Sequence, residues 1–173
     1  MLFETKMQNH DHNEIERIIR EAFAGVVLGE KGVGLWWGQV LDDYQMPASV
    51  AEYRINHEQT EERMDWSLIP NSDLNYCYDS LFFFDADGMR FHLPAFLIFD
   101  LRGEFNNDIL ATLCVGDDDY SKKQFSVLNT KQRMAVRTFL LFVQDDILCG
   151  GTQWCDFYLP HIEKALAEYW VKT

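Results

Sequence analysis

Two short aromatic-rich runs near the middle of the chain constrain its fold more than any other feature. Residues 81–84 and 89–93 are separated by residues 85–88, a connection that ends in Asp-Gly. A short connection with glycine, which readily adopts a left-handed backbone conformation, is typical of a β-hairpin. We therefore predict that the two runs pair as antiparallel strands. Residues 109–115 fit either a third strand or a helical turn, and we favour the strand.

Apolar residues before this hairpin recur at helical spacing and predict three helices. The first begins after Asp11, and the second covers residues 33–44 and is stopped by Pro47. The third covers residues 49–65, because a Ser-x-x-Glu sequence at its start is typical of a helix cap. Most of this third helix is charged and is expected to be solvated.

Three further helices are predicted after the hairpin. Pro94 suits the first turn of a short helix, Asn129 or Thr130 caps a long one, and Pro160 suits the first turn of the last. The expected fold is therefore α+β. It is a mainly helical single domain over residues 1–173, with a small antiparallel sheet built on one β-hairpin.

The chain is strongly acidic, with 28 acidic and 15 basic residues and a formal net charge of −13. A field of this sign repels phosphate and disfavours sequence-independent binding of nucleic acid or of anionic membranes, so neither is expected as a partner. It favours a basic protein partner. The longest apolar stretch, residues 93–99, is too short to span a bilayer, and no signal peptide is recognised at the start, so a cytoplasmic location is expected.

The cysteines and glycine-rich segments do not predict a cofactor or metal site. The four cysteines, Cys77, Cys114, Cys149 and Cys155, lack the spacing of zinc knuckles or redox pairs, so buried free thiols are expected. The acidic turn at residues 85–88 lacks the distal glutamate of a calcium loop.

Two features of the sequence are candidate partner-binding sites. Trp36 and Trp37 are adjacent on a predicted helix, so either both are buried or one projects as an anchor. Three carboxylates also stand beside a tyrosine in an unassigned loop, where a basic partner could dock: Asp117, Asp118, Asp119 and Tyr120. The alternatives are core packing for the tryptophans and a solvated loop for the carboxylates.

Arg90 and His92 form a different candidate site. On the predicted strand, residues two apart point to the same face, where an arginine and a histidine could bind an anion or perform acid–base chemistry. Trp66 is expected to lie near this pocket. The alternative is that the face is the solvent side of the hairpin.

Three segments resemble a family of small acidic bacterial proteins of unknown function. The central segment, residues 82–97, is the most specific. The matching residues are Asp65-Trp66 and Ile69-Pro70; Phe84-Asp85, Gly88, Arg90-Phe91 and Leu93-Pro94-Ala95-Phe96-Leu97; and Leu128, Gln132, Val136 and Phe139-Leu140. The resemblance implies a common fold and carries no activity, cofactor or catalytic residue.

The leading hypothesis is a non-enzymatic cytoplasmic protein of the immunity or antitoxin type, which binds a basic protein through its acidic surface. Its support is the charge excess and the lack of a recognisable catalytic motif. The rival hypothesis is an enzyme or small-ligand binder with a pocket near Trp66, Arg90 and His92. The sequence leaves the oligomeric state open.

Overall fold

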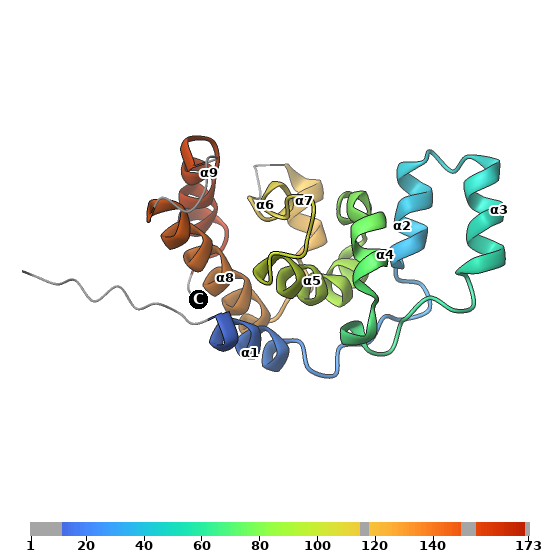
Figure 1. The fold of residues 1–173 in the computed structure, drawn as a ribbon, viewed down its shortest axis with the longest axis horizontal. Coiled ribbons are helices and arrows are strands. Elements are labelled where there is room, and N and C mark those ends of the chain that lie inside the picture. The colour runs from blue at the N-terminus through green and yellow to red at the C-terminus, as the bar shows by residue number, and fades with distance from the viewer. Residues whose placement is uncertain (1–11, 115–117, 150–154, 172–173) are drawn as a thin grey trace, which may run out of the picture.

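The computed structural model describes residues 12–114, 118–149 and 155–171, with the side chains of residues 155 and 156 left out. Every regular element in these residues is a helix (Figure 1). The elements, including two short 3₁₀ helices, are α1 (His12–Ala22), α2 (Leu35–Asp42), α3 (Pro47–Asn56), η1 (Trp66–Leu68), α4 (Asn71–Tyr76), η2 (Tyr78–Phe82), α5 (Ala86–Leu101), α6 (Leu110–Leu113), α7 (Asp119–Gln124), α8 (Thr130–Leu148) and α9 (Cys155–Glu168).

The expected α+β fold with a β-hairpin is wrong, since the described residues contain no strand. The first aromatic run lies around the end of η2, and the second lies inside α5. Asp85 starts that helix instead of a turn, because its side chain accepts a hydrogen bond of 2.8 Å from the Gly88 amide. Gly88 is required for close approach, because a Cβ atom there would collide with the carbonyl oxygen of Val33.

Helix α5 was missed because it is buried on almost every side. Nearly all of its residues from Gly88 to Leu101 are buried, so its sequence shows no separate polar face. Pro94 lies inside this helix and not in the first turn of a separate one. Proline has no N–H group, so the carbonyl of Arg90, four residues earlier, receives no hydrogen bond from it.

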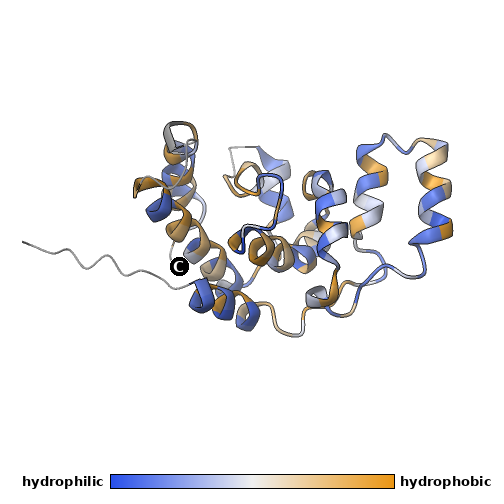
Figure 2. Cartoon of the chain, viewed as in Figure 1, coloured by the Kyte–Doolittle hydropathy of each residue, from blue (hydrophilic) through white to orange (hydrophobic). Residues whose placement is uncertain are grey.

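The other helices pack around α5 and form one connected hydrophobic core. Helix α5 contacts α1, η1 and α7, while α8 packs between α1 and α9. In Figure 2 the apolar colours run along α5 and α8 in the body of the molecule. Helices α2 and α3 form a pair at the opposite end from α9, and α2 is joined to the body by contacts with η2 (Figure 1).

Of the predictions for the other helices, one is confirmed and two need correction. The long helix is confirmed as α8, where Asn129 and Gln132 form a capping box with two hydrogen bonds of 3.0 Å. The third predicted helix is shorter than expected, because α3 has Pro47 in its first turn and ends at Asn56. The serine and glutamate expected to cap it make no cap. Pro160 lies inside α9 and not in its first turn.

The third predicted strand is also wrong where the structure describes it, because Leu110–Leu113 forms α6. Cys77, Cys114 and Cys149 are free thiols, as predicted, but only Cys77 is fully buried. The side chain of Cys155 lies outside the described residues. Among the described helices, none combines the length and the apolar character needed to cross a membrane.

We predict that Asp85→Ala lowers the free energy of unfolding by about 2 kcal/mol, because it removes the acceptor of two backbone amides. These amides belong to Gly88 and, at 3.1 Å, to Val33. Asp87→Ala is the matched control in the first turn of the same helix. It should cost less than half as much in urea unfolding at pH 7, and equal losses would contradict the capping role of Asp85.

Candidate functional site

The start of helix α2 is capped by a carboxylate from a distant part of the chain. The Trp36 amide donates a hydrogen bond of 2.6 Å to Glu61, whose side chain is only 3% exposed. The cap position itself is Gly34, which has no side chain to offer, and a Cβ atom there would collide with the Glu61 carboxylate. Glu61 therefore satisfies an amide that the helix end leaves unpaired.

Arg63 holds Glu61 and the connection before α2 in one arrangement. Its guanidinium lies 3.2 Å from the Glu61 carboxylate and donates to the carbonyls of Gly29 at 2.6 Å and Gly32 at 2.8 Å. Burial raises the pKa of Glu61, and the Trp36 amide and Arg63 oppose that rise. The negative charge of Glu61 is thus held inside the protein by directed donors.

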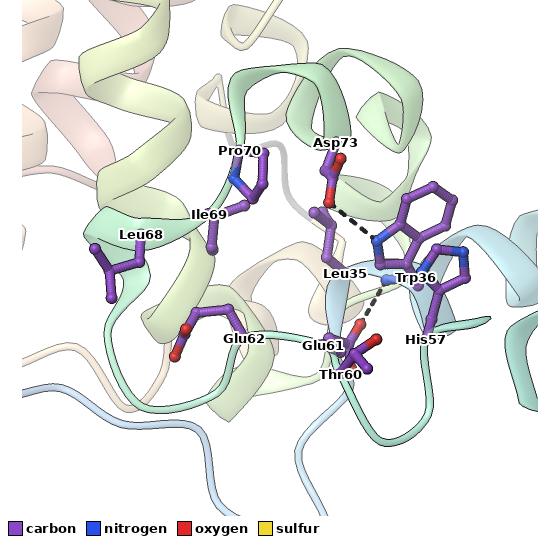
Figure 3. A pocket seen from close by; sticks show the side chains of 10 residues that line it. All are labelled: Leu35, Trp36, His57, Thr60, Glu61, Glu62, Leu68, Ile69, Pro70 and Asp73. Carbon is purple, nitrogen blue, oxygen red and sulfur yellow. Dashed lines mark hydrogen bonds between the residues drawn. The ribbon is translucent and has the colours of Figure 1, made fainter. Parts of the chain in front are cut away.

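The indole of Trp36 is held in place by a stacked ring and by a hydrogen bond. It stacks on His57 with ring centroids 3.6 Å apart and an angle of 10° between the planes. Its N–H group donates to Asp73 at 3.4 Å (Figure 3). Tyr76 lies beside it, with centroids 5.1 Å apart. Trp36 is therefore held in a defined orientation but remains half-buried, and it is not a fully buried core residue.

A cavity of about 220 Å³ opens beside this indole, here called the Trp36 pocket. Figure 3 shows three carboxylates, from Glu61, Glu62 and Asp73, around it. The rest of the lining consists of Leu35, Trp36, His57, Thr60, Leu68, Ile69 and Pro70. A much smaller hollow of about 20 Å³ shares Trp36 and His57 and adds Asp43 and Glu52.

The chemistry of the Trp36 pocket suits a cation. Its lining contains no lysine or arginine. Glu62 is oriented by the amides of Met64 at 2.8 Å and Asp65 at 2.9 Å, both on the same oxygen. An ammonium or guanidinium group would find carboxylate acceptors and an aromatic ring side by side, and both interactions favour positive charge.

A metal site is not formed here. The described part of the chain contains no cluster of three histidine, cysteine, aspartate or glutamate side chains able to hold a metal ion.

Of the residues predicted to bind a partner, only Trp36 lines this pocket. Trp37 is half-buried and lies against Tyr53, with ring centroids 5.1 Å apart. Asp118 caps α7 by accepting a hydrogen bond of 2.7 Å from the Ser121 amide, and that bond lowers the pKa of Asp118.

The remaining residues of the predicted acidic loop lie next to this cap. Asp119 is the first residue of α7. Tyr120 donates a hydrogen bond of 2.9 Å to the carbonyl of Phe82. Asp117 lies outside the described residues.

The structure does not bring Trp66, Arg90 and His92 together in one pocket. Since α5 is a helix, Arg90 and His92 project about 200° apart and do not share a face. His92 is fully buried, its Nδ1 lies 2.8 Å from the Gly88 carbonyl, and burial lowers its pKa to about 3. Trp66 is buried beside Arg20 and donates to the Phe23 carbonyl at 3.0 Å.

Sequence reasoning missed Glu61, Asp73 and His57. Glu61 lies in a charged segment that was interpreted as the solvated face of a helix. No local spacing connects it with Trp36, which precedes it by 25 residues. The sequence around Glu61 therefore contains no signal strong enough to identify a buried helix cap.

We predict that Glu61→Ala lowers the free energy of unfolding by about 2 kcal/mol or more, because it leaves the Trp36 amide and Arg63 without their buried acceptor. Glu62→Ala is the neighbouring control, because its two hydrogen bonds lie at the exposed surface. Its loss in urea unfolding at pH 7 should be clearly smaller. A cost for Glu62→Ala as large as that for Glu61→Ala would contradict the buried-cap account.

Comparison with known proteins gives a family but no function. A model described as a family of unknown function (DUF6714) matches residues 11–173. No curated protein and no solved structure matches the chain.

Proposed function

The chain belongs to the DUF6714 family, and we propose that it is a non-enzymatic protein that binds a basic protein partner at the Trp36 pocket. In this proposal a lysine or arginine side chain of the partner enters the pocket. The observation that carries it is the lining of the pocket, in which Glu61, Glu62 and Asp73 lie beside the indole of Trp36 and no lysine or arginine is present. Glu61 is paired with Arg63 from outside the lining, so Glu62 and Asp73 are the acids left to meet a cation.

The dimensions of the Trp36 pocket support a side chain as its occupant. A cavity of about 220 Å³ is below the size of most pockets that enclose whole drug-sized molecules, which begin at about 300 Å³. It has room for the charged head of one side chain and a few water molecules. A guanidinium has five N–H donors in a planar arrangement, so an arginine side chain can bond to more than one carboxylate.

The surface beyond the pocket has the apolar side chains that a protein interface uses. At the α2–α3 end, Tyr44 is 92% exposed, Ile55 is 81% exposed and Met46 is also exposed. Tyr44 and Gln45 have positive φ angles of 55° and 53°, which is an uncommon backbone conformation for residues other than glycine. Tyrosine and methionine are enriched in interfaces.

Electrostatics favours the same kind of partner at longer range. The formal net charge of −13 attracts a basic protein and accelerates its encounter with the acidic surface. The immunity or antitoxin type, the cytoplasmic location and the resemblance to small acidic bacterial proteins are finer parts of this proposal. The immunity or antitoxin type is supported by the acidity of the chain, and the resemblance by the segment 82–97.

A lysine- and arginine-rich peptide is the probe for this proposal, followed by two-dimensional NMR. In 20 mM salt we expect the indole N–H signal of Trp36 to shift on titration, and the Glu62→Gln, Asp73→Asn double variant to bind about tenfold more weakly. Both substitutions remove charge but keep an oxygen acceptor, so the fold should persist.

The control is the Glu30→Gln, Glu163→Gln double variant, which removes two charges from exposed positions outside the pocket. It should weaken binding by less than about threefold, because only long-range attraction is lost. Equal weakening by the two double variants, or signal shifts centred on Asp118 and Tyr120, would contradict binding at the Trp36 pocket.

A further inference from the structure

A second and larger cavity lies away from the Trp36 pocket, among α1, the end of α5, α8 and α9. It has a volume of about 830 Å³ and is here called the Asp100 cleft. This volume lies in the range of about 300–1,000 Å³ that is usual for small-molecule sites. Figure 1 shows these helices in the part of the molecule opposite α3.

One wall of the Asp100 cleft carries carboxylates. Asp100, near the end of α5, is half-buried, and its side chain forms no hydrogen bond or ion pair with any described residue. Asp108 lines the same cleft and is oriented by the Leu110 amide at 2.8 Å. Asp146 lines it from α8. Lysine and arginine are absent from the described lining.

Helices α8 and α9 also contribute apolar side chains to the lining of the Asp100 cleft. Phe142 and Val143 line the cleft from α8, and Phe157 and Tyr158 line it from α9. Phe157 is 60% exposed, although it is a large apolar side chain that normally gains free energy from burial. An apolar ligand body placed here would cover surface that the described chain leaves in contact with water.

We propose that the Asp100 cleft binds a small organic cation, in which an ammonium group lies between Asp100 and Asp108 and an aromatic or aliphatic body packs against Phe142 and Phe157. Charge complementarity selects the sign of the ligand, because three acids line the cavity and no lysine or arginine does. The apolar wall selects an organic body over a metal ion. This proposal is independent of the one for the Trp36 pocket.

The same arrangement makes binding depend on pH. Burial and, to a smaller extent, the nearby Asp108 raise the pKa of Asp100 to about 7. The other titratable groups that line the cleft are His12, Asp146 and Tyr158. Asp100 is protonated and uncharged at pH 5.5 and ionised at pH 8, so the affinity for a cation rises as the pH rises through 7.

Calorimetry with 2-phenylethylammonium chloride, and with 2-phenylethanol as its neutral counterpart, tests the proposal on the full chain. A primary ammonium resembles that of lysine, whose pKa is about 10.4, so the probe stays charged at both pH values. At pH 8 we expect the ammonium to bind at least about tenfold more tightly than the alcohol, and more tightly than at pH 5.5 by about fivefold.

Asp100→Asn is the main variant, and it should remove most of the preference for the ammonium and most of the pH dependence. Asp42→Asn is the matched control, since burial also raises the pKa of Asp42 but its side chain does not line the cleft. It should leave both unchanged. Phe157→Ala, at an exposed position, should weaken the ammonium and the alcohol alike, and it tests the site even if Asp100→Asn folds poorly.

The proposal is overturned if the alcohol binds as tightly as the ammonium, or if neither probe binds at millimolar concentration. It is also overturned if Asp42→Asn lowers the affinity as much as Asp100→Asn. An affinity that is the same at pH 5.5 and pH 8 would exclude Asp100 as the charged acceptor.

Discussion

The carboxylate of Asp85 is the contact on which the rest of the structure depends. It accepts a hydrogen bond from the Gly88 amide, which starts the buried helix α5, and one from the Val33 amide, which fixes the connection before α2. The same connection is held from its other side by Arg63. Asp85 therefore caps the core helix and also fixes the segment that leads into the helix carrying Trp36. One set of polar contacts thus links the core to the candidate site.

Helices with a solvated face were predictable from the sequence, but the core helix was not. Helix α8 has a polar side and a capping box at Asn129, and its position was predicted correctly. Helix α5 has almost no polar side, and its aromatic runs looked like strands because burial on all sides removes the helical period. An Asp-x-x-Gly sequence fits both a turn and a helix start, and only the Val33 contact from a distant segment distinguishes them.

The candidate site could be predicted only in part, because its residues come from distant parts of the sequence. Trp36 was one of the residues predicted to bind a partner, with core packing as the alternative, and it lines the Trp36 pocket. Its neighbours Glu61 and Asp73 come from 25 and 37 residues away, and no local pattern indicates that they meet. The pocket predicted from Arg90 and His92 depended on a strand, so it was lost with the strand. The net charge led us to expect a positively charged partner, and the fold has two cavities lined by carboxylates.

Native-state hydrogen exchange measures most directly whether α2 is joined to the core through the Asp85 and Glu61 contacts. We expect the amides of Val33, Trp36 and Gly88 to open with nearly the same free energy as those in the middle of α5, while those of α3 open far more easily. Helix α3 has no fully buried residue, which makes it the internal reference. If the Trp36 and Val33 amides instead exchanged as fast as those of α3, the contacts of Asp85 and Glu61 would not hold the candidate site to the core.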